Sequence, residues 1–281
     1  MRFVDFARAH GLEIRDLYPS EKIRRCGTVD KPRSTNGAYF YDGERGWVQN
    51  WANGSSVVWF SDPDAKPWTE EDKARWKQKR QAANAKQDES HEKAAIRAQE
   101  MLSKGQMGEH NYLHLKGFPE VTGIVLEDML LIPMRNVLTN KIQGVQTIRW
   151  IEQDRRYEKK MIYGMKAKGA VFRFGSPQAT ETFLCEGYAT GLSIQKALRS
   201  IGLSASVLVC FSANNMEYVS GLVKGKRYIY ADNDESGAGE KAAKATGLPY
   251  CMSDTVGNDA NDDHLSKGVF EVCRKIMQVR M

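Results

Sequence analysis

Two short stretches decide the fold: residues 182–187, with the sequence TFLCEG, and residues 227–234, with the sequence RYIYADND. Each is an apolar run followed by a carboxylate, Glu186 in the first and Asp232 in the second. Around them, strand-like and helical stretches alternate, which is typical of a parallel sheet covered by helices on both faces. Such sheets bind ligands at the carboxyl ends of their strands. The sequence therefore predicts an α/β unit over residues 179–281.

The elements expected in this unit follow from apolar periodicity and from the residues that start and stop helices. We expect strands at residues 182–185, 207–211 and 227–231, and helices at residues 189–201, 215–223, 239–246 and 262–279. Gly237 and Gly239 superficially suggest a phosphate loop, but the spacing of that motif is not met. We interpret both glycines as turn and helix-entry positions, and we expect no helicase motor in the chain.

The acidic residues at the strand ends predict a cation site. Side chains alternate along an extended segment, so Asp232 and Asp234 point to the same side, and Glu186 stands beside a tight turn at Gly187. Three carboxylates in one crevice repel one another unless a cation neutralises them, and Mg²⁺ prefers such hard oxygen ligands. The alternative is that these are ordinary loop acids, because Asp and Gly both favour turns. A third acidic cluster at residues 257–263 makes chance less plausible.

The N-terminal residues 1–66 predict a small β-rich domain. Residues 38–41, 46–51 and 57–60 are aromatic and β-branched, and Asp42-Gly43 and Asn53-Gly54 are strong turn signals between them. A short helix is expected near residues 3–10. The aromatic side chains either form the core that so small a unit needs or stack on unpaired bases.

Residues 67–105 predict a long helical linker. Thr69 can cap its free amides, and the composition up to Lys104 is rich in Ala, Lys, Gln and Glu but poor in large apolar residues. Its basic part, residues 73–87, either follows a phosphate backbone or is simply a solvated face.

Residues 106–178 predict a sheet-rich module with several basic side chains. A helix at residues 110–116 is stopped by Gly117 and Pro119, and strands are expected at residues 129–134, 142–148 and 170–174.

Composition bounds the class of protein. The net charge of +6 favours nucleic acid over other anionic partners only weakly. The five cysteines are scattered singly, with no pairing at zinc-ligand spacing, so no zinc is expected. No apolar run approaches the roughly 18 residues of a membrane span, and the N-terminus does not read as a signal peptide. We therefore expect a cytoplasmic protein with no membrane association.

Residues 182–191 together with residues 230–237 resemble the TOPRIM domain shared by primases, topoisomerases and some nucleases. Residues 112–119 are similar to the helix that opens the basic subdomain of primases, particularly plasmid- and phage-borne ones. Other motifs look like the rest of that basic subdomain in bacterial-type primases: residues 131–135, 144–149, 157–160 and 162–164. The resemblance covers roughly residues 107–275. It implies a TOPRIM parallel sheet flanked by helices and preceded by a basic α+β subdomain.

The resemblance also implies roles for individual residues. Glu186 would act as a general acid or base or would position the metal. Asp232 and Asp234 would bind the Mg²⁺ or Mn²⁺ that carries the nucleotide phosphates. Asp259 and Asp262 would bind the metal or support its ligands. Four basic residues would hold the template or the incoming triphosphate: Arg135, Arg149, Lys159 and Lys160.

Three hypotheses follow. The first is a primase that makes short oligonucleotides from nucleoside triphosphates on a single-stranded DNA template, with a separate replicative helicase as partner. The second is a TOPRIM nuclease. The third is a non-catalytic single-stranded-DNA-binding accessory protein, because the family's usual N-terminal zinc ribbon cannot be built from these cysteines. A topoisomerase fits less well, because it needs a nucleophilic tyrosine on a further domain.

Overall fold

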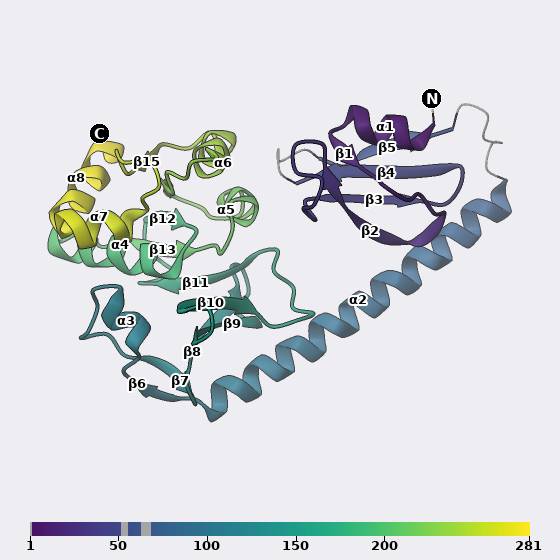
Figure 1. The fold of residues 1–281 in the computed structure, drawn as a ribbon. Coiled ribbons are helices and arrows are strands. Elements are labelled where there is room, and N and C mark those ends of the chain that lie inside the picture. The colour runs from purple at the N-terminus through teal and green to yellow at the C-terminus, as the bar shows by residue number, and fades with distance from the viewer. Residues whose placement is uncertain (1, 52–55, 63–68) are drawn as a thin grey trace. The chain divides into compact units, whose positions relative to one another are not determined.

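The computed structural model describes residues 2–51, 56–62 and 69–281 (Figure 1). The chain divides into two compact units, Met1–Arg80 and Gln81–Met281. None of the described helices combines the length and apolar character that crossing a membrane requires.

The first unit is a five-stranded antiparallel sheet with one short helix. Its strands pair in chain order, and the helix α1 supplies Phe3, whose ring stacks on Tyr41 with 4.4 Å between centroids and meets Phe60 edge-on at 5.3 Å. The elements are α1 (Phe3–Ala9), β1 (Leu12–Glu13), β2 (Ser20–Thr28), β3 (Gly37–Tyr41), β4 (Arg45–Asn50) and β5 (Val58–Ser61). The predicted helix and three strands are confirmed, whereas β1 and β2 were not expected. The predicted turn at Asn53-Gly54 lies outside the described residues.

The aromatic side chains of this sheet divide between its two faces. Those facing α1, such as Phe60, are buried core, as one of the two interpretations held. On the opposite face Trp59 is 67% exposed, although Trp76 covers part of that face by packing on Phe40 with 6.2 Å between ring centroids.

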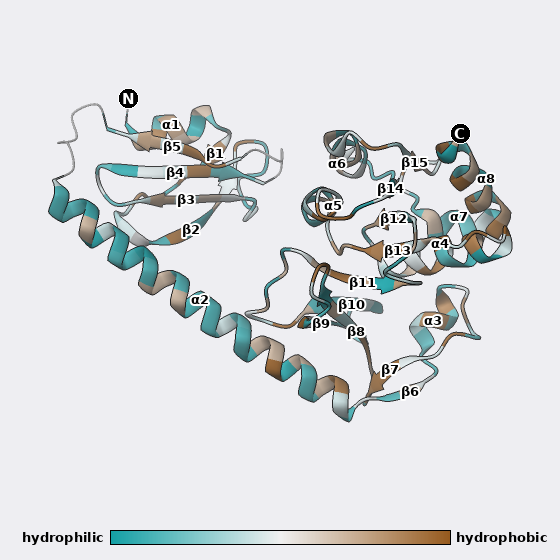
Figure 2. Ribbon diagram, turned by 180° about the vertical axis from the view of Figure 1, so that it is seen from behind, coloured by the Kyte–Doolittle hydropathy of each residue, from teal (hydrophilic) through white to brown (hydrophobic). Residues whose placement is uncertain are grey.

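The long helix α2 (Glu70–Lys104) begins as the sequence predicts. Thr69 Oγ1 accepts the amide of Asp72, and Asp72 returns a carboxylate to the Thr69 amide, which is a capping box. In Figure 2 the helix is mainly hydrophilic after Glu70 and more hydrophobic toward Lys104. There Ala98 is fully buried in a small cluster with Leu131 and Val145. The end of the linker is therefore part of the second unit's packing.

The second unit is built on one ten-stranded mixed sheet. Its strand order is β10-β9-β8-β11-β13-β12-β14-β15, with β7 pairing on β8 and β6 on β7. The strands are β6 (Gln106–Gly108), β7 (Gly123–Leu126), β8 (Met129–Asn136), β9 (Ile142–Ile151), β10 (Arg156–Met161), β11 (Ala170–Phe174), β12 (Glu181–Cys185), β13 (Ser206–Val209), β14 (Lys226–Ala231) and β15 (Tyr250–Met252). From β13 to β15 all pairs are parallel.

Helices cover both faces of the parallel part, as predicted. Helices α4, α7 and α8 pack together over one face, and α5 and α6 lie together over the other (Figure 1). The short α3 begins at His110, whose ring accepts the Tyr112 amide, and buries Tyr112 and Leu113 in the core shared with α4. The helices are α3 (Asn111–Leu115), α4 (Tyr188–Ser200), α5 (Ala213–Ser220), α6 (Ala238–Thr246), α7 (Ala260–Lys267) and α8 (Val269–Arg280).

Strands β6, β7, β10 and β15 were not expected, and two further features differ from the sequence expectation. The single helix predicted at residues 262–279 is two helices, because Gly268 adopts φ 86° and ψ 166° and turns the chain between α7 and α8. The parallel sheet is also not separate from the module before it. Strand β11 pairs antiparallel with β8 through Ala170 and Val171, and with β13 through its last three residues.

Replacing Gly268 by Ala tests the break between α7 and α8. Nothing lies within 4 Å of the added Cβ, so the cost is backbone strain alone, about 1–3 kcal/mol of unfolding free energy. Gly221→Ala is the matched control, because Gly221 has φ −74° and only an ordinary contact at 3.6 Å. Urea titration of both variants measures the difference, and equal midpoints would contradict the assignment.

Candidate active site

The candidate site lies where two adjacent parallel strands end. Strand β12 pairs with β14 from Glu181↔Lys226 to Leu184↔Ile229, so Glu186 and Asp232, which follow the two strands, emerge at the same edge of the sheet. The chain leaves β12 into α4 on one face and leaves β14 into α6 on the other. This is the position at which open α/β sheets bind ligands.

Asp232 is the most perturbed acid of the group. Its Oδ1 is buried and has no hydrogen-bond partner among the described residues. Burial, and then the charges of Asp259, Glu186 and Asp234, raise its pKa to about 7, against the opposing effect of Lys159. A carboxyl group in that position is poised between its neutral and charged forms at physiological pH.

The backbone around Asp232 is tightly fixed. The first turn of α6 approaches so closely that a Cβ on Gly239 would lie 2.3 Å from the Asp232 carbonyl oxygen. Gly237, with φ 66°, forms the N-cap of the same helix. Both glycines are therefore turn and helix-entry residues, as the sequence predicts.

Asp234 and Glu186 have different environments. Asp234 accepts the amides of Ser236 at 2.9 Å and Gly239 at 3.0 Å, which fixes it at the start of α6. Burial raises the pKa of Asp234, but these hydrogen bonds together hold it below the usual value. The pKa of Glu186 is raised by burial and by the charge of Asp234, while the Ala213 amide opposes the shift.

Asp259 and Asp262 form the capping box of α7. Asp259 Oδ1 accepts the amides of Asn261 at 2.7 Å and Asp262 at 3.0 Å, and Asp262 Oδ2 accepts the Asp259 amide at 3.1 Å. Thr190 in the first turn of α4 donates its hydroxyl to Asp259 Oδ2 at 2.8 Å. Both carboxylates therefore cap the start of α7. The charge of Asp259 also raises the pKa of Asp232, and both charges raise the pKa of Lys159.

Carboxylate oxygens are suitable ligands for a hard divalent cation, but these acids are not drawn together around one point. Across residues 2–51, 56–62 and 69–281, no three acidic, histidine or cysteine side chains form a group that could hold a metal ion. The residues with the strongest claim are Glu186 and Asp232, because burial disfavours their charge and Asp232 Oδ1 has no partner. Mg²⁺ binds such carboxylates while keeping several waters.

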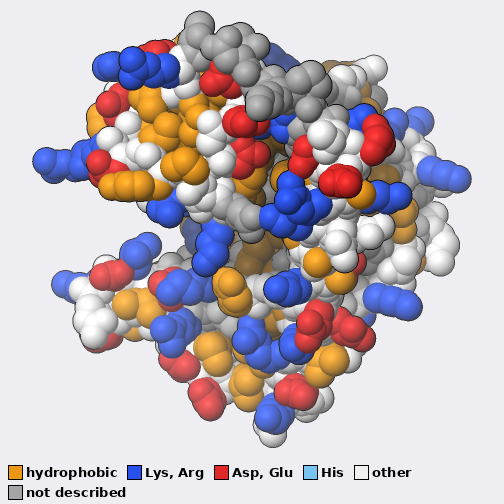
Figure 3. All heavy atoms as spheres, turned by 90° about the vertical axis from the view of Figure 1, so that its right-hand side faces the viewer, with side chains coloured by type: hydrophobic (Ala, Val, Ile, Leu, Met, Phe, Trp, Pro, Cys, Tyr) orange, Lys and Arg blue, Asp and Glu red, His pale blue; other side chains and the backbone are white. Residues whose placement is uncertain are grey.

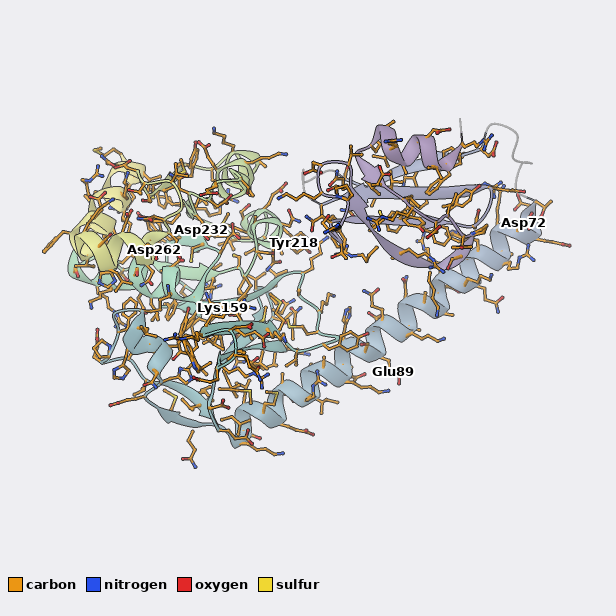
Figure 4. The ribbon with its side chains drawn as sticks, viewed as in Figure 1. Asp72, Glu89, Lys159, Tyr218, Asp232 and Asp262 are labelled. Carbon is orange, nitrogen blue, oxygen red and sulfur yellow. The ribbon has the colours of Figure 1, made fainter. Side chains whose placement is uncertain are left out.

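Of the four basic residues predicted to line the site, the structure brings Lys159 to the acids. Burial and the charge of Lys116 lower the pKa of Lys159, whereas Asp259, Asp232 and Asp262 raise it. In the view of Figure 4, Lys159 lies below Asp232 and Asp262. A cation beside three carboxylates is well placed to attract phosphate groups that arrive with a metal.

The other three predicted basic residues lie elsewhere. Glu158 pairs with Lys160 at 2.8 Å and with Arg149 at 3.9 Å, on the face of β10 opposite to that of Lys159. Arg135 donates to the Asn140 carbonyl at 3.1 Å in the turn between β8 and β9. The structure therefore does not gather these side chains into one basic trough with Lys159.

Sequence reasoning missed two contributors. Lys116, at the end of α3, lies close enough to Lys159 to lower its pKa. Thr190 ties Asp259 to α4. Thr190 lies four residues after Glu186, one turn into the helix, and that spacing was the available signal.

The titration of Asp232 predicts how stability depends on pH. Its pKa is about 7 in the folded protein against 3.8 for the free group, so the native state binds the extra proton and unfolding becomes easier as pH rises from about 4 to about 7. Asp232→Asn removes this loss and should raise the unfolding free energy by up to about 4 kcal/mol at about pH 8, and by less than about 2 kcal/mol at about pH 5. Thermal unfolding in chelator measures both values.

Glu235→Gln is the control for that experiment, because Glu235 is exposed in the same loop. A gain for Asp232→Asn that does not change with pH would contradict the titration of Asp232.

Comparison with known proteins supports the description of the C-terminal region. A family model for the Toprim domain matches residues 181–269. A solved structure of the DnaG catalytic core is similar over 64% of this chain and 68% of that chain, with 13% sequence identity and a TM-score of 0.39. Comparison with curated proteins gives no match. The matched region holds β12 to α7 and all five acids of the candidate site, so residues 181–269 of the chain form a Toprim domain.

Proposed function

We propose that the chain is a primase-like nucleotidyltransferase that makes short oligonucleotides on single-stranded DNA with the help of a divalent metal. The observation that carries the proposal is the buried, unpartnered Oδ1 of Asp232, at a strand end shared with Glu186 and faced by Lys159. The Toprim match over residues 181–269 supports a nucleic-acid enzyme of this class.

Each side chain has a separate task in this proposal. Glu186 and Asp232 hold the metal, which when bound would carry the phosphates of the nucleoside triphosphate. Asp234 stays at the start of α6 and contributes its charge, as Asp259 and Asp262 do from the start of α7. Lys159 neutralises charge on the phosphates, which in phosphoryl transfer is most of the catalysis. A separate helicase would supply unwound template.

A Toprim nuclease is the second candidate, and one observation favours it. Arg149 and Lys160 are paired with Glu158 away from the acids, so the site presents Lys159 and Lys116 rather than an extended basic trough for template and triphosphate. Cleavage of a strand needs fewer phosphate contacts than templated synthesis.

Incubation with single-stranded DNA, labelled nucleoside triphosphates and Mg²⁺ or Mn²⁺ tests the proposal. Short products should form, and chelation, Asp232→Asn and Glu186→Gln should each reduce them on the order of 100-fold, because the metal ligands are lost. Glu235→Gln, in the exposed part of the same loop, should retain activity. Products that persist without metal would reject the primase assignment. Strand scission without nucleotides would replace it with the nuclease.

Comparing Lys159→Gln with Lys160→Gln tests which basic residue serves the site. The two neighbours lie on opposite faces of β10, and only Lys159 interacts with Asp232. We expect Lys159→Gln to lower product formation by about 10-fold or more and Lys160→Gln to lower it much less. Equal losses in the same assay would show that the distinction between the two faces is wrong.

A further inference from the structure

The first unit contains a pocket that the Toprim site does not explain. Its volume is about 610 Å³, and it lies where β1 and the segment after it meet β2. Ile14, Gly27 and Tyr39 among its lining residues are buried, and Cys26 is half-buried. The pocket therefore has a packed floor.

Four arginines surround this floor: Arg15, Arg24, Arg25 and Arg33. All four are exposed, and none of them forms an ion pair within the described part of the chain. The carboxylates among the lining residues are Glu13 and Asp16, and Arg8 already pairs with Glu13 at 3.8 Å. The pocket thus carries an excess of uncompensated positive charge.

Clustered positive charge without ion-pair partners is not the general pattern of this molecule. On the face shown in Figure 3, Lys and Arg side chains lie interspersed with Asp and Glu. In the second unit, Arg274 contacts both Asp254 and Glu271, and Arg280 contacts Glu181. The repulsion among the pocket arginines is a cost that an anion would relieve.

The backbone fixes the arginines around the pocket. Gly27 lies so close to the loop after β2 that a Cβ there would be 2.3 Å from the Pro32 carbonyl oxygen. This contact holds the loop that carries Arg33 against β2. Arg24 and Arg25 pair with Tyr39 and Ala38 of β3, so the sheet fixes the backbone of both arginines at the border of the pocket.

The chemistry of the pocket favours a phosphate ester. Burial raises the pKa of Cys26 to about 11, so its thiol stays neutral and the pocket keeps its positive sign. Guanidinium groups bind phosphate oxygens through paired hydrogen bonds. The Arg25 guanidinium lies 3.4 Å from the ring centroid of Trp51, which is 47% exposed, so a flat surface on which a base can stack adjoins the pocket.

We propose that this arginine pocket binds phosphate groups of a nucleotide or of single-stranded nucleic acid, as a site separate from the Toprim acids. It is independent of the activity proposed above, because it needs neither the metal nor any residue of the second unit. A free nucleotide and a nucleic-acid strand present the same phosphate chemistry, and experiment can tell the two sources apart.

The test uses the full chain in chelator, where metal-dependent binding at the Toprim acids is removed. Tripolyphosphate and ATP are titrated by calorimetry, and a fluorescein-labelled oligothymidylate by anisotropy. Arg24→Gln combined with Arg33→Gln should weaken binding by about 10-fold or more, because two charged donors are lost. Lys31→Gln, an exposed lysine two residues from Arg33 that does not line the pocket, should change it less than about twofold.

The two probes identify the source of the phosphate. Arginine-dependent binding of tripolyphosphate and ATP indicates a nucleotide site, and arginine-dependent binding of the oligonucleotide alone indicates a strand site. Both titrations are made in chelator and follow residues of the first unit alone, so failure of the primase proposal does not affect this one. If no probe binds, or if Lys31→Gln weakens binding as much as the arginine changes do, the proposal is overturned.

Discussion

The second unit depends on holding several carboxylates at one edge of a sheet. Because β12 and β14 are adjacent and parallel, Glu186 and Asp232 must emerge together, and their charges repel. Part of this repulsion is offset because Asp234 and Asp259 lie at the amino ends of α6 and α7. Free amides and the helix dipole favour negative charge there. Asp232 has no such helix terminus, and its pKa is raised by burial and then by the charges of Asp259, Glu186 and Asp234, with Lys159 opposing the shift.

The basic module reaches the acids because it belongs to the same sheet. The hydrogen-bonded order from β10 through β9, β8 and β11 to β13 brings β10 into a fixed relation with the Toprim strands. Alternation along β10 then decides which side chain takes part. Lys159 pairs with the buried Ile148, and its Nζ lies 5.5 Å from the ring centroid of Tyr112, whereas Glu158 and Lys160 point to the other face. A shift of one residue in this register would exchange their roles.

The sequence predicted the parts of this structure that depend on local pattern. Neighbouring residues were enough to predict the apolar strands that precede Glu186 and Asp232. They were also enough to predict the cap at Thr69 and the turn glycines. Contacts between distant segments were not. The approach of Lys159 depends on a strand register, and the arginine pocket depends on β1 and β2, whose pairing the sequence did not indicate. The helix break at Gly268 was missed because apolar periodicity continues across it, although glycine itself was the signal.

Strand β11 also limits how the chain can be divided. The sequence suggested a boundary between residues 178 and 179, but β11 precedes that point and pairs with Val207, Leu208 and Val209 of β13. All three residues are buried. A fragment starting at residue 179 would expose the amides and carbonyls of an apolar edge strand, the kind of surface on which proteins aggregate. In this chain, the strand that covers the edge of the Toprim sheet at β13 comes from the preceding module. Neither the Toprim region nor that module can therefore be replaced without the other.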